Sequence, residues 1–148
     1  MKKILVPTDF SVEAKNALNL AIQLAEKEYS EIYLLHIADI PVVSDPVGAN
    51  IHAYLSNDAM TSLMENVHTK LDDFSRFYSG EVKIHLNMEW GSPYSGIIKS
   101  IEELDCDFVV MGSKGASGLK ELIIGSNAEK IIRNSPVPVI RLRKKLTW

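Results

Sequence analysis

The chain has 148 residues and a formal net charge of −3, with 46% hydrophobic and 24% charged residues. These values are typical of a globular protein, and we expect residues 1–148 to form a single domain. The negative charge gives no general attraction to nucleic acids, and no apolar stretch approaches the ~20 residues of a membrane span. The start of the chain becomes polar too quickly for a secretory signal. We therefore expect a cytoplasmic protein without a membrane partner, and we disfavour nucleic acid as a partner.

Two local features leave alternatives open. Basic residues gather near the end of the chain, at Arg141, Arg143, Lys144 and Lys145. We favour solubilising charges on an exposed edge strand over a nucleic-acid patch. Cys106 is the chain's one cysteine. It cannot form an internal disulfide, and its apolar neighbours favour a buried position over a reactive thiol.

Strand-like and helix-like patterns alternate from the start of the chain, as in α/β domains with a mainly parallel sheet. The apolar run at 2–8 predicts a first strand, and Ser11 is a plausible N-cap for the helix that follows. Residues 31–38 predict the second strand. Residues 39–56 show no clear period, and we interpret them as a long loop. Apolar residues then recur at helical spacing over about 60–78.

The second half continues the alternation. Residues 81–90 alternate strictly between apolar and polar side chains, which predicts a third strand at an edge or with one wet face. Ser92 followed by a proline predicts the start of a helix. The continuous apolar run at 107–112 predicts a central fourth strand. Ser126, with a glutamate three residues later, matches a capping box for a helix that ends near Asn134.

The strand patterns also predict the order of the sheet. A fifth strand at 137–143 contains Pro138, which cannot donate to a ladder, so this strand belongs at an edge. With the third strand also outside, we expect a five-stranded parallel sheet of order 3-2-1-4-5 with helices on both faces. Ligands bind such sheets where the strand order reverses, which here lies between 7–11 and 111–115.

Glycine is concentrated at this predicted crevice. Residues 111–132 hold four of the chain's eight glycines, among them Gly112, Gly115 and Gly125. Glycine lets the main chain approach a ligand closely, and the following helix would present free N–H groups to an anion such as phosphate. Turn glycines with an ordinary helix cap explain the residues equally well. The spacing fits neither a Walker A loop nor a dinucleotide-binding fingerprint.

An anion alone would not bind tightly here. A helix N-terminus contributes about 0.3–2 kcal/mol, whereas micromolar affinity needs about 8 kcal/mol. The rest of the ligand would have to bury a flat, partly apolar group, as a nucleoside does. Asp9 could accept hydrogen bonds from its ribose or base. Capping of the first helix together with Ser11 is an equally supported role for Asp9.

The glycines and the serine after them follow the pattern G-x2-G-x9-G-S, through Gly112, Gly115, Gly125 and Ser126. This pattern resembles the nucleotide-binding signature of the universal stress protein family. The resemblance extends to 2–21, 33–41 and 125–140, and so covers nearly the whole chain. It implies a five-stranded α/β fold, and it implies ATP as the ligand, with or without Mg²⁺, because members with the full signature bind ATP.

The resemblance also implies the residues of the site and of a dimer. The implied nucleotide-binding residues are Pro7, Thr8, Asp9, Ile37, Met111, Gly112, Lys114, Gly115, Gly125, Ser126 and Asn127. Two of them depart from the common family pattern, in which His or Arg often stands at Lys114 and a small apolar or hydroxyl residue at Asn127. The implied homodimer pairs the fifth strands through Val137, Val139, Ile140 and Arg141.

No catalytic residue is predicted. The four histidines show no metal-binding spacing; we expect His36 to pack within its strand and His68 and His85 to face solvent. His52 lies in the unassigned loop, where a ligand role is a minority interpretation. Our first hypothesis is a nucleotide-dependent regulatory module, in which ATP orders residues 116–124 for an unidentified partner. A slow ATP hydrolase and a structural dimer that binds no nucleotide are the alternatives.

Overall fold

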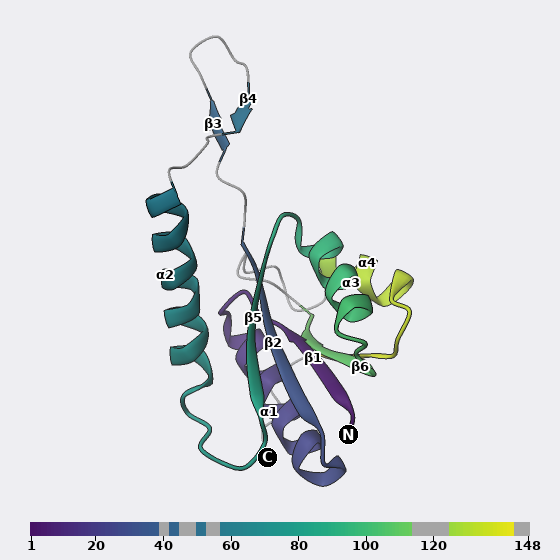
Figure 1. The fold of residues 1–148 in the computed structure, drawn as a ribbon. Helices are drawn as coiled ribbons and strands as arrows, with labels where there is room; N and C mark the ends of the chain where they lie inside the picture. The colour runs from purple at the N-terminus through teal and green to yellow at the C-terminus, as the bar shows by residue number, and fades with distance from the viewer. Residues whose placement is uncertain (39–41, 45–49, 53–56, 114–124, 144–148) are drawn as a thin grey trace.

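A five-stranded parallel sheet forms the centre of the protein (Figure 1). The computed structural model describes residues 1–38, 42–44, 50–52, 57–113 and 125–143. In the order in which they pair, the strands are β5 (Ile84–Trp90), β2 (Glu31–Ala38), β1 (Lys3–Pro7), β6 (Phe108–Gly112) and β7 (Val139–Leu142). This is the predicted order 3-2-1-4-5, with the two alternating strands at the edges. The predicted fold class is confirmed.

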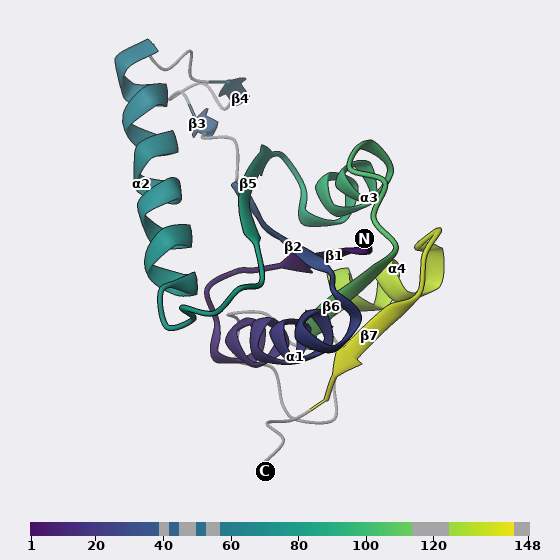
Figure 2. The same cartoon turned by 60° about the horizontal axis from the view of Figure 1, so that its bottom comes forward.

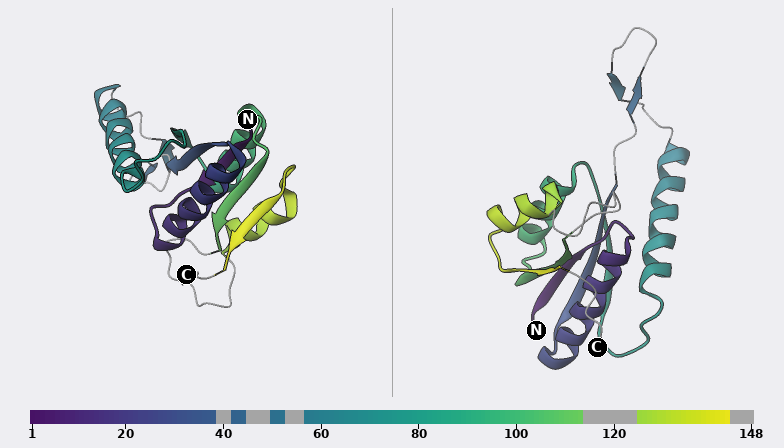
Figure 3. Two further views of the ribbon diagram at one scale, coloured as in Figure 1. Left: turned by 90° about the horizontal axis from the view of Figure 1, so that it is seen from below. Right: turned by 180° about the vertical axis from the view of Figure 1, so that it is seen from behind.

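Helices cover both faces of the sheet (Figures 2 and 3). α1 (Val12–Glu28) and α2 (Asn57–Ser75) lie on one face, and α3 (Pro93–Glu103) and α4 (Ser126–Asn134) lie on the other. Within the described ranges, no helix is long and apolar enough to cross a membrane.

The two faces of the sheet carry two hydrophobic cores. Successive side chains of a strand point to opposite faces. In β1, Ile4 and Val6 therefore pack in the core that contains α1, whereas Leu5 packs with Ile97 and Ile131 in the core beneath α3 and α4. All five side chains are at most 4% exposed. This two-sided burial explains why the central strands read as continuous apolar runs.

The segment predicted as a long loop contains two short strands. β3 (Val42–Ser44) and β4 (Asn50–His52) pair antiparallel, with Val43 opposite Ile51. The loop prediction is wrong here, because three prolines or glycines and no clear period outweighed the β-branched residues that favour strands. The hairpin lies beyond α2, away from the main sheet (Figures 1 and 3). The rest of the predicted loop lies outside the described residues.

Two predicted boundaries near α2 are also wrong. The helix ends at Ser75, so Tyr78 lies outside it, and β5 starts at Ile84 rather than at Glu81. The Tyr78 hydroxyl accepts a hydrogen bond from the N–H of Val82 at 3.0 Å. That N–H is therefore used by a side chain in the connection and not by the sheet, which delays the start of the strand.

Two of the three predicted helix caps are confirmed. The Ser11 side chain accepts a hydrogen bond from the N–H of Ala14 at 3.2 Å, at the start of α1. At the start of α3, the Ser92 side chain accepts from the N–H of Ser95 at 3.4 Å, and Pro93 is the first helical residue. Both serines satisfy donors that the first turn of a helix leaves without an internal partner.

The third cap differs from the prediction. Gly125, not Ser126, is the N-cap of α4, and no side chain caps this helix. The N–H of Gly125 donates to the carbonyl oxygen of Ser113 at 2.9 Å, which ties the helix start to the end of β6. Glu129 pairs with Arg133 at 2.8 Å instead of completing a capping box. The first N–H groups of α4 thus lack the side-chain acceptor that the sequence predicted.

Gly112 ends β6 where α1 passes close to the strand. A Cβ built on Gly112 would lie 2.9 Å from the Cβ of Glu13 and 3.1 Å from its carbonyl carbon. A contact of 2.9 Å to another Cβ is shorter than real Cβ atoms show, and 3.1 Å to the main chain is tight, so a larger residue here would require α1 or the strand to shift. Helix packing therefore explains this glycine without reference to a ligand.

Cys106 lies in the core, as predicted. It is 4% exposed and has no disulfide partner. Burial raises the pKa of its thiol to about 11, which disfavours the reactive thiolate at neutral pH.

The observed caps predict that two similar substitutions differ in cost. Ser11→Ala should lower the free energy of unfolding by about 1 kcal/mol, because the N–H of Ala14 loses its acceptor. Ser126→Ala should cost little, since no side chain caps α4. Urea denaturation without nucleotide, followed by circular dichroism, measures both. Equal losses would contradict the observed caps.

The packing of α1 predicts that Gly112→Ala destabilises the fold. The added methyl group should cost about 1–3 kcal/mol, as overpacking of a close contact does. Glu13→Ala removes the carboxylate of Glu13 but keeps the Cβ that the new methyl group would meet. It is therefore the matched control for an effect of the carboxylate on stability. The same denaturation measurement applies. A Gly112→Ala variant as stable as the unchanged protein would show that α1 can yield at no cost.

Candidate functional site

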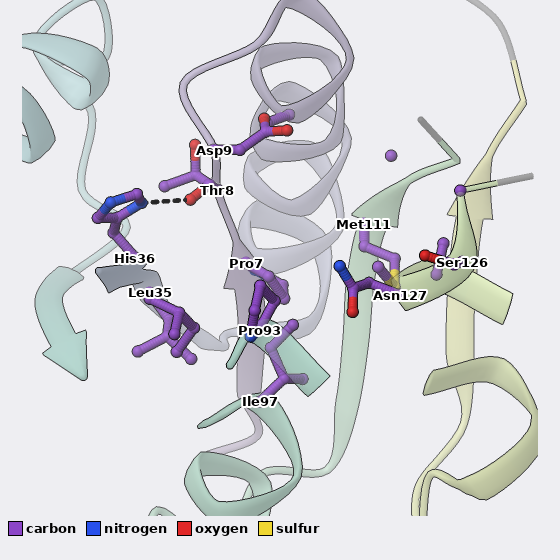
Figure 4. Close-up of a pocket in the computed structure, with 15 residues that line it drawn as sticks. Pro7, Thr8, Asp9, Leu35, His36, Pro93, Ile97, Met111, Ser126 and Asn127 are labelled. Atoms are coloured by element: carbon purple, nitrogen blue, oxygen red, sulfur yellow. Dashed lines mark hydrogen bonds between the residues drawn. The ribbon is translucent and has the colours of Figure 1, made fainter. Parts of the chain in front are cut away.

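A pocket of about 230 Å³ opens between the carboxyl ends of β1 and β6. This is the point where the strand order reverses and where ligands bind to doubly wound sheets. In Figure 4, Thr8 and Asp9 lie on one side of the pocket and Met111, Ser126 and Asn127 on the other. The residues that line it are Pro7, Thr8, Asp9, Ala14, Leu35, His36, Ile37, Pro93, Ile97, Met111, Gly112, Gly125, Ser126, Asn127 and Ala128.

Hydrogen bonds hold the turn after β1 in one conformation. The Thr8 side chain accepts from the N–H of Phe10 at 3.0 Å, and Asp9 Oδ1 accepts from the N–H of Ser11 at 3.0 Å. The N–H of Thr8 donates to the carbonyl oxygen of Leu35 at 2.8 Å. These bonds hold Phe10 at a φ of +64°, which is uncommon for a non-glycine residue. This side of the pocket is thus preformed.

His36 supports the same turn from β2. Its Nδ1 lies 2.9 Å from the carbonyl oxygen of Thr8, and because a carbonyl only accepts, Nδ1 carries the proton (Figure 4). The ring packs against Phe10 with 4.6 Å between centroids, and Phe10 meets Phe74 of α2 edge to face at 5.6 Å. His36 is packed as predicted, but it also lines the pocket, which the sequence analysis did not anticipate.

The other walls of the pocket combine apolar side chains with a helix end. Ile37 comes from β2 and Met111 from β6, while Pro93 and Ile97 come from the start of α3. The N-terminus of α4 meets the pocket at 125–128, without a side-chain cap. Such a helix end favours an anion.

The charges of the pocket are few. Among the lining residues that the structure describes, Asp9 is the only aspartate or glutamate, and none is a lysine or arginine. Asp9 Oδ1 accepts a hydrogen bond in the turn, and the same residue lines the pocket. Both roles predicted for Asp9, in the turn before α1 and toward a ligand, are therefore compatible. The arrangement suits a flat apolar group with hydroxyls near Asp9 and an anion near α4.

The structure brings the predicted site residues together. Apart from Lys114 and Gly115, which lie outside the described residues, every predicted residue lines the pocket. Their roles toward a ligand stay predictions. Six further lining residues were not predicted from the sequence: Ala14, Leu35, His36, Pro93, Ile97 and Ala128. The predicted topology held a signal for α3, because right-handed crossovers place α3 and α4 on the same face of the sheet.

His68 and His85 lie away from the pocket lining. His68 is exposed, as predicted. His85 does not simply face solvent: its Nε2 lies 2.9 Å from a Glu31 oxygen, and its ring stacks on Tyr33 with 4.4 Å between centroids. The hydrogen bond from His85 lowers the pKa of the Glu31 carboxyl. The side chain of His52 is outside the described part. In that part no three His, Cys, Asp or Glu residues gather as a metal site would require.

Comparison with known proteins gives consistent matches over nearly the whole chain. The solved structure of MJ0577, a universal stress protein of Methanocaldococcus jannaschii, superposes with a TM-score of 0.78 at 30% identity, covering 99% of this chain and 98% of that one. A universal stress protein in complex with cAMP gives a TM-score of 0.70 at 17% identity, with 98% of each chain covered.

A third structure, from Archaeoglobus fulgidus, is a universal stress protein in complex with dAMP. It gives a TM-score of 0.59 at 20% identity, covering 95% of this chain and 97% of that one. At the identities of the two nucleotide complexes, the likeness supports the fold alone. The model of the universal stress protein family matches residues 1–143. This chain therefore belongs to the universal stress protein family.

Proposed function

We propose that this protein binds an adenine nucleotide, ATP, in the pocket between β1 and β6. The observation that carries the proposal is that an apolar pocket meets a helix N-terminus that no side chain caps, at the point where the strand order reverses. Two relatives of the same fold were solved with cAMP and with dAMP, and both ligands combine an adenine nucleoside with phosphate. The glycine signature in the sequence supports the same ligand class.

Each part of the nucleotide has a wall of matching chemistry. The adenine would lie between Ile37 and Met111, and Pro7 and Thr8 would shape the adjoining wall. Asp9 would accept hydrogen bonds from the ribose or the base. Burial of a flat ring supplies affinity that a helix end, at about 0.3–2 kcal/mol, cannot supply alone.

The phosphates would lie against the main chain at Gly112, Gly125, Ser126 and Asn127. No cationic side chain appears in the described lining. We therefore assign the neutralising charge to Lys114 and to Mg²⁺ carried by the phosphates, since Mg²⁺ commonly binds through phosphate oxygens. Gly115 would allow the main chain to approach the phosphates.

We further propose that the protein acts as a regulatory module that pairs as a homodimer through β7. This strand is at the edge of the sheet, and Ile140 is 37% exposed there. An edge strand presents unpaired main-chain groups that a second copy can complete. Nucleotide binding would then regulate a surface read by a further protein.

Nucleotide binding predicts a loss on Gly115→Val. The purified protein should release an adenine nucleotide on denaturation and bind added ATP in calorimetry, and Gly115→Val should abolish both, because a β-branched residue blocks close approach of the main chain. Gly118→Val is the matched control, since Gly118 lies in the same segment outside the G-x2-G-x9-G-S spacing. Absence of ATP binding by the unchanged protein would refute the proposal. Release of ADP during the assay would indicate hydrolysis.

The dimer predicts a difference between two exposed isoleucines. Ile140→Glu should convert the dimer to a monomer in light scattering after gel filtration, because it places a charge on the pairing edge. Ile132, 42% exposed on α4, is the matched control, and Ile132→Glu should leave the mass unchanged. A dimer that survives Ile140→Glu would place the interface elsewhere.

A further inference from the structure

The side chain of Ile37 lies between the pocket and α3. Its side chain lines the pocket and also touches Gly96, a buried residue in the first half of that helix. A Cβ built on Gly96 would lie 2.5 Å from Ile37 Cδ1, 3.1 Å from Cγ1 and 3.3 Å from Cγ2. The isoleucine therefore occupies the space that any other residue at position 96 would need.

The helix cannot easily retreat from this contact. Ile97 and Ile101 hold α3 in the core and are 4% and 2% exposed. The main chain of Ile37 is held as well, because this part of β2 pairs with β5 and Ile37 lies opposite Glu89. The isoleucine side chain is the part that can move.

We propose that Gly96 is a positioning residue that sets the width of the pocket at its base-binding end. It lets Ile37 lie back against α3 and so leaves the space between Ile37 and Met111 open for a flat ring. The inference rests on the proposed nucleotide function. It assigns the width of the base-binding end to a residue that does not itself line the pocket. Glycine within a helix lowers stability relative to alanine, so this position gives up stability for space.

The direct test is Gly96→Ala, measured by calorimetry with ATP and with AMP. The new methyl group should displace Ile37 into the base end, and a misfit of that size in an apolar pocket lowers affinity by about tenfold or more. ATP and AMP should lose affinity by the same factor, because they share the base and differ only in phosphates. Thermal unfolding without nucleotide should show a smaller loss of stability than Gly112→Ala does, because the nearest atom that the methyl group meets is the end of a flexible side chain and alanine favours the helix.

Two further variants separate positioning from a general effect on the helix. Ile37→Val removes Cδ1, the atom nearest to the new methyl group. Adding Gly96→Ala to Ile37→Val should therefore change ATP affinity by only about twofold or less relative to Ile37→Val alone. The difference from the tenfold loss in the unchanged background would show that the two positions couple. Ser95→Ala, at an exposed position of the same helix, is the matched control and should bind ATP as the unchanged protein does.

The outcomes distinguish this inference from the function on which it rests. Failure of the unchanged protein to bind ATP would overturn both. Normal binding by Gly96→Ala, or an equal loss in the Ile37→Val background, would overturn the positioning role and leave nucleotide binding intact. A larger loss for ATP than for AMP would place the effect at the phosphates and also overturn it. The positioning role would also be overturned if Gly96→Ala prevented folding and Ile37→Val did not restore it.

Discussion

The close contact between α1 and the end of β6 is the constraint on which the pocket depends. Gly112 allows it, because a Cβ there would lie only 2.9 Å from the Cβ of Glu13 and 3.1 Å from its carbonyl carbon. The contact fixes the distance between the turn after β1 and the end of β6, which form opposite walls of the pocket. Since both strands are buried on two faces, neither wall can shift without disturbing a core.

Glycine has a second packing role on the other face of the sheet, where Gly96 makes room for Ile37. The two glycines act through the packing of helices on opposite faces of the sheet, α1 for Gly112 and α3 for Gly96. Gly125 differs from both: its N–H bonds to Ser113, and the helix it starts has no side-chain cap. Close packing thus explains Gly96 and Gly112, whereas Gly125 has a φ of −58°, which other residues also adopt.

The fold was largely predictable from the sequence, because strands buried on two faces read as continuous apolar runs and edge strands as alternating ones. That difference gave the strand order. The predictions failed where a tertiary hydrogen bond outweighed a local sequence pattern. Ser126 and Glu129 match a capping box, but the N–H of Gly125 bonds to Ser113 and the helix starts one residue earlier. The hairpin of β3 and β4 lay among turn-forming residues that concealed its short strands.

By itself the sequence determined the α/β class, the strand order and the segments that meet at the crevice, because these follow from periodicity and from the handedness of the crossovers. Tertiary structure alone decided that His36 holds the turn at Thr8, that Pro93 and Ile97 close the pocket from α3, and that Gly96 accommodates Ile37. These relations join residues far apart in the chain, or depend on distances of a few ångströms between side chains. No local pattern of residue types encodes such distances, since they arise only when helices and sheet pack together.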